Sequence, residues 1–430
     1  MGAFAFRLPM SKRILLTTFG SLGDLHPYLA LAIGLRERGF APLLATHGVY
    51  REKIESEGIA FHPVAPDLNE FGDEKSFTRR AFALHGGAQF LVQTVVAEPI
   101  RRTYASLEAA TDAHRPDLFV THPLTFAAPL LAEKRGLPWV SVALAPGSMM
   151  SAHDPFVFPQ APFISRLQPL LGAANFGKLL RLMLRVGYGW TNAVRELRVE
   201  IGLPRSDADP LFAGASPFGT LALFSSVLGT PQPDWFPNTT QTGFCFYDKL
   251  AAGSRLPAEI AAFLATGDAP IVFTLGSAAV MDAGNFFTES AEAARMVGAR
   301  AILLTGKDPS NVPASLPDGV FAVPYAPFSE LFPSCAVLVH QGGVGTTGQS
   351  LRAGRPQLIV PHGFDQPDNA DRCVRRGVAR TVSRYRYTAP AVARELRTLL
   401  SDTRYAERAA ILGEQVRGEN GIVAACDAIE

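Results

Sequence analysis

Short apolar runs alternate along this chain with longer segments in which apolar residues recur every three or four positions. The short runs end at glycine or proline, and such continuous apolar runs are typical of strands buried on both faces of a parallel sheet. The longer segments have helical spacing, as in residues 27–38, which stop at Gly39. We therefore predict strands over 13–19, 41–45, 118–121 and 139–144, and again over 271–275, 301–304, 336–339 and 357–360.

The same strand–helix alternation occurs in both halves, so the predicted fold class is α/β with two tandem doubly wound (Rossmann-like) domains and a cleft between them. A Pro-rich, aromatic stretch separates the halves. We expect a loose tail over 1–11, and the predicted boundaries are an N-terminal domain over 1–230, a linker over 231–248, a C-terminal domain over 249–403 and a final helical stretch over 404–430.

The segment from residue 156 to 190 differs from both halves. It begins with closely spaced prolines and continues as helical stretches rich in Leu, Met and Phe with interspersed Arg. One interpretation is a set of helices covering a domain edge. The other is an apolar pocket for a substrate.

Composition narrows the class of protein. Hydrophobic residues make up 47% of 430 residues, which is enough for two buried cores, and the formal net charge of +1 does not favour nucleic acid as a partner. No uncharged apolar run of about 18 residues occurs, so no integral membrane span is predicted. Four dispersed cysteines and the lack of a secretory signal favour a cytoplasmic protein.

A glycine-rich turn follows the predicted strand at 336–339, in the sequence VLVHQGGVGTTGQ over 337–349. Glycines let the backbone approach an anion, and the free N–H groups at a helix start stabilise phosphate. The turn therefore predicts a phosphate site, although a tight turn without a ligand has the same pattern.

A second interpretation of this turn has to be kept open. Gly343, Gly345 and Gly348 satisfy GxGxxG, and Asp365 follows at the distance of a ribose-binding acid. This would make the protein an NAD(P)-dependent oxidoreductase. Against it, the motif lies in the second half of the chain, and Asp365 belongs to a longer block, PHGFDQPDNA.

The stretch from 325 to 369 resembles the donor-binding signature of family 1 glycosyltransferases, which have the two-domain GT-B fold. FGSLGDLHP at 19–27 is similar to the GSxGDxxP opening of the bacterial and sterol branch, and TLGS at 274–277 and TG at 305–306 extend the likeness over nearly the whole chain. Within this branch, the sequence also resembles rhamnolipid-type rhamnosyltransferases. The resemblance implies an inverting transfer of a hexose, glucose or rhamnose, from a UDP- or dTDP-sugar to a hydroxyl of an apolar small molecule or lipid. It also implies that 404–430 packs back toward the N-terminal domain.

The resemblance assigns roles to individual positions. Asp365 and Gln366 match the pair that holds the donor sugar. This chain departs from the family at Gln341, where a His usually precedes the glycines, with His340 one place earlier. The resemblance implies that Tyr325 stacks on the base of the nucleotide and that Gln349 binds the ribose. It places Ser277 near the phosphates. The residues expected at the pyrophosphate turn are His340, Gln341, Gly342, Gly343, Gly345 and Thr346.

A base is needed to take the proton of the attacking hydroxyl, and Asp24 follows the first predicted strand. The resemblance makes Asp24 the catalytic base; without a catalytic role, it would be the N-cap of a helix starting at Pro27. His26 is an alternative base. His122 follows the strand at 118–121, where a helper group lies in plant members, and is a second catalytic candidate.

The sequence offers no convincing metal site. Asp207 and Asp209 form a DxD, but they follow GLPRS instead of a buried strand, and the histidines lack zinc-binding spacing. We expect no metal and no cofactor, the nucleotide sugar being a co-substrate. A sugar-nucleotide-binding protein without activity remains the further alternative.

Overall fold

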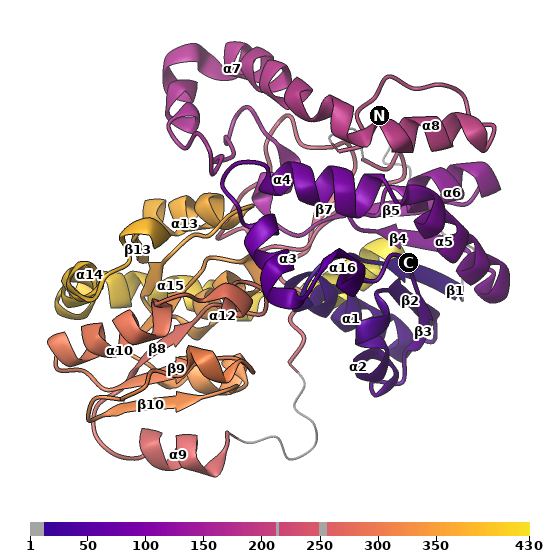
Figure 1. The fold of residues 1–430 in the computed structure, drawn as a ribbon. Helices are drawn as coiled ribbons and strands as arrows, with labels where there is room; N and C mark the ends of the chain where they lie inside the picture. Colours follow the sequence, from indigo (N-terminus) through magenta and orange to yellow (C-terminus); the bar gives the residue numbers. More distant parts are fainter. Residues whose placement is uncertain (1–12, 212–214, 249–255) are drawn as a thin grey trace.

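The computed structural model describes residues 13–211, 215–248 and 256–430, so the predicted tail at 1–11 lies outside the described residues. Two α/β domains lie side by side, the first on the right of Figure 1 and the second on the left. The chain folds into two parallel sheets, of seven strands in the order β3-β2-β1-β4-β5-β6-β7 and six in the order β10-β9-β8-β11-β12-β13. The predicted fold class is confirmed.

The strands of the first sheet are β1 (Arg13–Thr17), β2 (Ala41–Thr46), β3 (Ala60–Pro63), β4 (Leu118–Thr121), β5 (Trp139–Ala143), β6 (Thr220–Ala222) and β7 (Thr239–Gln241). The second sheet contains β8 (Ile271–Thr274), β9 (Ala301–Leu304), β10 (Val320–Val323), β11 (Val337–His340), β12 (Gln357–Ile359) and β13 (Ala379–Thr381). The central strands are apolar throughout because helices cover both faces of each sheet.

The first domain carries α1 (Leu22–Glu37), α2 (Arg51–Glu55), α3 (Glu74–Ala81), α4 (Gly87–Gln89), a π-helix η3 (Phe90–Ala97), α5 (Ile100–His114), α6 (Ala127–Arg135), α7 (Gln168–Leu184) and α8 (Asn192–Glu200). The second carries α9 (Ala258–Leu264), α10 (Phe286–Met296), α11 (Phe328–Leu331), α12 (Val344–Ala353), α13 (Gln366–Arg375), α14 (Ala389–Ser401), α15 (Thr403–Gly418) and α16 (Gly421–Ile429). Within the described ranges, no helix is both long and apolar enough to cross a membrane.

Helix α1 starts five residues before Pro27, where the sequence had suggested a beginning. Ser21 is the N-cap, and its side chain accepts a hydrogen bond from the Gly23 N–H. Asp24, the third residue of the helix, accepts a hydrogen bond from the Ser21 N–H and completes a capping box. The cap stabilises a start that the position of Pro27 alone would not predict.

The predicted linker at 231–248 includes residues that belong to the first sheet. Strand β7 lies inside the predicted linker at 231–248, yet it pairs with β6 as the last strand of the first sheet. The pattern hid this strand because it is only three polar residues long and lies among prolines. The chain therefore leaves the first sheet after Gln241.

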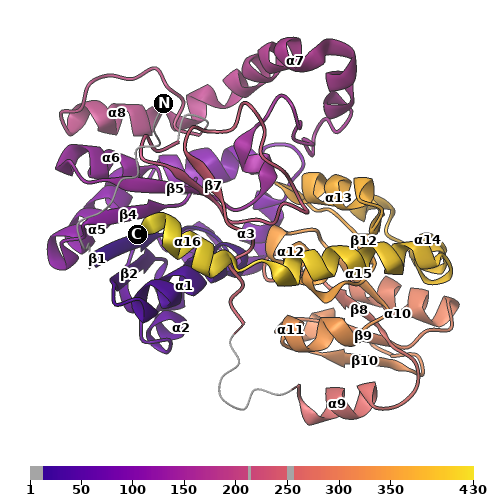
Figure 2. The same cartoon turned by 180° about the vertical axis from the view of Figure 1, so that it is seen from behind.

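The end of the chain returns to the first domain. Helix α15 lies on the second domain, and α16 continues onto the first, as the yellow helices of Figure 2 show. Ala425, Cys426 and Ile429 pack into the apolar core beside α1. Arg38 at the end of α1 forms ion pairs with Asp427 at 2.6 Å and Glu430 at 3.0 Å.

A buried ionic network joins the two domains. The Arg372 Nε lies 2.8 Å from the Asp368 carboxylate within α13, and both side chains are almost fully buried. From the first domain, the Val157 N–H donates to Asp368 at 3.1 Å, and Asp154 forms an ion pair with Arg372. Asp154 also pairs with Arg375, which is half exposed.

Arg372→Ala is expected to lower the free energy of unfolding by about 3–5 kcal/mol, because it leaves two carboxylates buried without their cation. The control Arg375→Ala removes an exposed partner of the same Asp154 and should change it by about 0–1 kcal/mol. Thermal unfolding of both variants measures the difference. Equal melting temperatures would show that the network does not hold the domains together.

Candidate active site

The strand order of each sheet changes direction at one point, and the carboxyl ends of the two strands there flank a crevice. In the first sheet these strands are β1 and β4. Asp24 follows β1 and His122 follows β4, and the His122 Nε2 lies 3.5 Å from the Asp24 carboxylate oxygen Oδ1. The topology therefore places the two predicted catalytic residues together.

The two carboxylate oxygens of Asp24 have different partners. Oδ2 accepts hydrogen bonds from the Ser21 N–H at 2.8 Å and the Ser21 hydroxyl at 3.3 Å, while Oδ1 faces His122. About a third of the side chain is exposed. Asp24 thus supports the cap of α1 with one oxygen and presents the other to the cleft.

The tautomer of His122 follows from its surroundings. The Leu124 N–H donates to the His122 Nδ1 at 3.1 Å, so in the neutral ring the proton lies on Nε2. This Nε2 is nearly buried and lies close to the Asp24 carboxylate.

His26 lies in a different environment, and this argues against it as the base. Its ring packs against Tyr247, with centroids 4.9 Å apart. Burial, reinforced by nearby Lys53 and opposed by Asp248, lowers the pKa of His26 to about 3. An imidazole with so low a pKa is a weak proton acceptor at neutral pH.

In the second sheet the order changes between β8 and β11, where the glycine turns lie. Helix α12 begins at Val344 with Gly343 as N-cap, and a Cβ added at Gly345 would meet no atom within 4 Å. The first-turn N–H groups of this helix therefore border open space, with Thr346 beside them, as an anion site requires. Ser277 follows β8 at the same edge.

Gln341 fills the space between the two glycine turns. A Cβ on Gly276 or on Gly343 would lie 2.2 Å or 2.9 Å from the Gln341 Nε2, so a larger residue at either position would force the Gln341 side chain to move. Gln341, which replaces the usual histidine, thus packs between the two glycine turns, and its buried Oε1 has no hydrogen-bond partner among the described residues.

The His340 ring holds the glycine turn through two hydrogen bonds, so neither ring nitrogen is free to bond to the predicted nucleotide. Its Nδ1 accepts from the Gly342 N–H at 3.0 Å, and its Nε2 donates to the Gln357 side chain at 2.9 Å. Both ring nitrogens are therefore occupied. Burial lowers the pKa of His340 to about 4, so the ring is neutral.

Asp365 and Gln366 lie where β12 leads into α13. The Asp365 carboxylate accepts from the Asn369 amide at 2.7 Å. The Gln366 side-chain oxygen accepts from the His362 N–H at 2.8 Å and the Gly363 N–H at 3.3 Å, so its amide N–H groups remain to donate to a ligand.

Asn369 is a site residue that the sequence reasoning missed. Besides Asp365, its amide donates to the Gly342 carbonyl at 2.9 Å and so ties the sugar-binding turn to the phosphate turn. Its position one helical turn after Asp365, within the block PHGFDQPDNA, was the available signal.

Asp365 has a perturbed acidity. Burial raises the pKa of Asp365 to about 7, the negative charge of Asp24 adds to the rise, and the hydrogen bond from Asn369 opposes it. The charge of Asp24 thus acts on Asp365 although the two residues belong to different domains. Because folding raises this pKa, ionisation of Asp365 destabilises the fold as pH rises from the usual aspartate range toward 7.

The nucleotide end of the site is more open. Tyr325 follows β10, and its side chain is 69% exposed, free to stack on a base. Gln349 donates to Asp248 at 3.0 Å, and Arg352 forms an ion pair with the same carboxylate. A ribose at the predicted Gln349 position would therefore meet a polar group already held by Asp248.

An apolar cavity of about 20 Å³ lies behind the catalytic pair. His47 lines it, donates its Nδ1 proton to the Pro66 carbonyl at 3.1 Å and leaves its buried Nε2 without a partner. Burial lowers the pKa of His47, so the free Nε2 is a hydrogen-bond acceptor. The other lining residues come from the ends of β1, β3 and β4 and from η3 and α5: Thr18, Phe19, Val64, Ala65, Val95, Val96, Ile100, Thr103, Leu124, Thr125 and Phe126.

Two motifs remain to be explained, the GxGxxG at 343–348 and the DxD formed by Asp207 and Asp209. The GxGxxG follows β11, the fourth strand of its sheet along the chain, whereas a dinucleotide fingerprint follows the first. Asp209 of the DxD accepts hydrogen bonds from Thr191 and the Leu211 N–H, both at 3.1 Å, in the connection after α8.

Comparisons with known proteins agree with this geometry. Residues 14–132 match the glycosyltransferase family 28 N-terminal domain, and residues 292–421 match the C-terminal domain typified by erythromycin biosynthesis protein CIII. O-mycaminosyltylonolide 6-deoxyallosyltransferase of Streptomyces fradiae is 34% identical over 430 residues, covering 97% of each chain.

More distant similarities extend the comparison. Sterol 3-beta-glucosyltransferase of Neurospora crassa is 29% identical over 99% of this chain, which spans only 27% of that protein. The crystal structure of the glycosyltransferase of kitacinnamycin has a TM-score of 0.71 at 22% identity, covering 98% of this chain and 99% of that one.

Two parallel-sheet domains that face each other across a phosphate turn and a carboxylate define a glycosyltransferase of the GT-B fold. The chain belongs to the family 1 glycosyltransferases. The oxidoreductase alternative finds no support in these relatives.

Lowering the pH from 8 to about 6 should weaken binding of the donor sugar nucleotide about tenfold, because roughly a tenth of Asp365 is ionised one pH unit below its pKa. The ionised form is the better acceptor for sugar hydroxyls. Isothermal titration with a UDP- or dTDP-sugar measures this. Asp365→Asn should flatten the pH profile, and an unchanged profile would assign the effect to another group.

Proposed function

We propose that this protein transfers a 6-deoxyhexose from a dTDP-sugar to a hydroxyl of an apolar small molecule or lipid, with inversion and without a metal. The observation that carries the proposal is the pair of facing sites: Asp24 with its His122 donor on one domain, and the α12 start with Asp365 on the other. UDP and a glucosyl donor are the alternative.

The proposed reaction is a direct displacement. The substrate hydroxyl attacks the anomeric carbon, and Oδ1 of Asp24 accepts its proton while His122 stabilises the carboxylate. The bond to the diphosphate breaks, and the N–H groups at the start of α12, with Thr346 and Ser277, stabilise the leaving phosphates in place of a cation. Asp365 and Gln366 hold the sugar hydroxyls.

The preference for a deoxy sugar has support on both sides of the cleft. The Phe82 and Phe364 rings, one from each domain, meet edge to face at 5.0 Å immediately before Asp365. An apolar wall beside the sugar site favours a methyl group over a hydroxymethyl group. The relative from Streptomyces fradiae is named for a 6-deoxyallosyl transfer.

The apolar character of the acceptor substrate is proposed from the names of the relatives, because the apolar cavity near the ends of β1 and β4, at about 20 Å³, has room for little more than a water molecule. Curated relatives are named for O-mycaminosyltylonolide and for sterol. All four cysteines are buried free thiols, which is compatible with the cytoplasm as the proposed location.

Asp24→Asn should reduce turnover by about 100-fold or more while melting temperature and donor affinity stay close to wild type. The amide oxygen can still accept from the Ser21 N–H, so the cap survives and only the proton acceptor is lost.

A matched control is Asp73→Asn, which alters a capping aspartate of α3 that accepts from the Ser76 N–H. It should transfer sugar normally. Near-normal turnover in Asp24→Asn together with a lower melting temperature would make Asp24 a cap only and remove it as the base.

Donor choice and metal dependence can be measured together. Thermal shift and turnover with dTDP-rhamnose, dTDP-glucose and UDP-glucose should rank the 6-deoxy donor first, by about tenfold for a methyl against a hydroxymethyl in an apolar site. Excess EDTA should leave the rates unchanged. Loss of activity with EDTA and its recovery with Mg²⁺ or Mn²⁺ would contradict the metal-free mechanism. A preference for UDP-glucose would contradict the proposed dTDP-linked 6-deoxyhexose donor.

A further inference from the structure

A protruding segment of the first domain combines exposed apolar side chains with a one-sided charge. We call residues 156–190 the α7 arm. Figures 1 and 2 both show α7 at the top of the molecule, reaching beyond its own sheet toward the side of α13. Neither sequence interpretation, an edge cover or a substrate pocket, accounts for its outer face.

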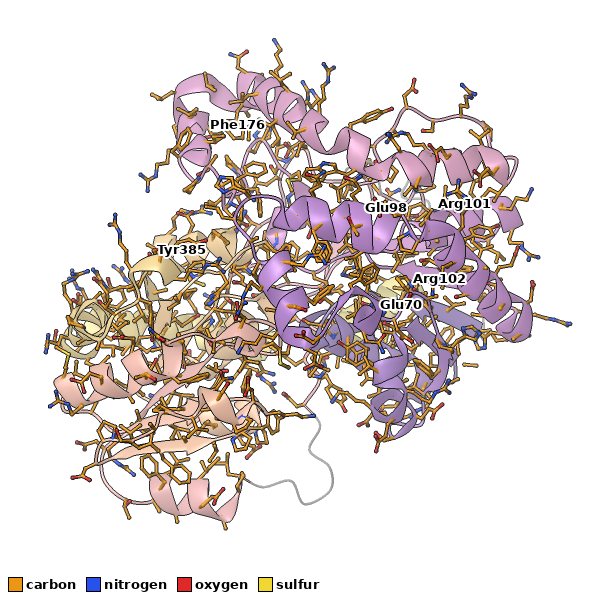
Figure 3. The ribbon with its side chains drawn as sticks, in the orientation of Figure 1. Glu70, Glu98, Arg101, Arg102, Phe176 and Tyr385 are labelled. Atoms are coloured by element: carbon orange, nitrogen blue, oxygen red, sulfur yellow. The ribbon has the colours of Figure 1, made fainter. Side chains whose placement is uncertain are left out.

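Only the inner face of α7 is packed. Phe176 is 1% exposed and lies on the side of the helix turned toward the domain (Figure 3), with Gly177 and Leu180 beside it. Large apolar side chains of the arm are open to solvent on both sides of the kink at Gly172: Phe163 at 62% and Leu170 at 82% exposed before it, and Leu182 at 61% and Val186 at 75% after it. A cluster of this kind marks an interaction surface.

The charge of the arm has a single sign. From residue 155 to 195 the sequence contains no Asp or Glu, although the whole chain has a net charge of only +1. Four basic residues of this stretch are exposed, namely Arg166, Lys178, Arg181 and Arg185. The arm therefore carries a local positive charge, although the protein as a whole is nearly neutral.

The basic and apolar side chains lie in neighbouring rows. Lys178 and Leu182 are one helical turn apart, and Arg181 and Arg185 form the adjacent row on the same solvent side, opposite Phe176. Helices with this arrangement lie in the plane of a bilayer surface, with apolar side chains entering the headgroup boundary and cations contacting anionic lipid.

We infer that the α7 arm docks this enzyme onto an anionic lipid surface. The charge of the arm distinguishes between two possible binding partners. A second copy of the chain related by a twofold axis would bring the same cations face to face, which is unfavourable. Anionic lipid, in contrast, complements the cations. The arm is also connected to the cleft, because Val157 near its start donates to Asp368 of α13. Docking there gives the enzyme access to apolar substrates dissolved in the bilayer.

Flotation of the full-length protein with vesicles tests the inference. It should bind vesicles of phosphatidylcholine mixed with phosphatidylglycerol, bind pure phosphatidylcholine vesicles much more weakly, and dissociate as salt concentration rises. Arg181→Glu/Arg185→Glu and Leu170→Ser/Leu182→Ser should each weaken binding by about tenfold or more. All four side chains are exposed, so melting temperature and dTDP binding should not change.

Two double variants remote from the arm serve as matched controls. Arg386→Glu/Arg397→Glu changes the same charge on the second domain, and Val49→Ser/Ile411→Ser removes comparable exposed apolar side chains. Both should bind vesicles like wild type. The inference is overturned if wild type binds neither vesicle, if the arm variants bind as well as the controls, or if light scattering shows a dimer that Leu170→Ser/Leu182→Ser dissociates in place of vesicle binding.

Discussion

The active site depends on the fixed placement of two separate domains, and the buried contact of Asp368 with Arg372 is central to that placement. Asp368 receives the Val157 N–H from the first domain, and Arg372 pairs with Asp154 of the same domain. Asp365 lies one turn before Asp368 on α13. The interaction that joins the domains therefore also helps to fix the position of Asp365, the carboxylate proposed to bind the sugar.

This network was not predictable from the sequence. Charged residues in the helical block after Asp365 have the pattern of an ordinary solvent-exposed i, i+4 pair, and only the tertiary fold buries it. The strands, in contrast, could be predicted because parallel strands covered on both faces are apolar in their interior, as in β1, β8 and β11, which have polar residues only at their ends. Strand β7 was missed since a short polar edge strand has no such signal.

The candidate site shows the same division. Motif spacing indicated Asp24, the α12 turn and Asp365, because strand–turn–helix units bring their loops to one edge of a sheet. It could not indicate which ring nitrogens are free. His340 and His122 both lie at the ends of buried strands, yet His340 has both ring nitrogens hydrogen-bonded within the turn, while the His122 Nε2 lies 3.5 Å from Asp24.

Electrostatics explains why the carboxylates differ in character. Asp24 keeps one oxygen in a capping box at the positive end of α1, and this end stabilises a negative charge. Asp365 is buried and feels the charge of Asp24, which raises its pKa to about 7. In the proposed mechanism, sugar hydroxyls donate to Asp365 and so reduce the repulsion between the two ionised carboxylates, which leaves Asp24 as the proton acceptor.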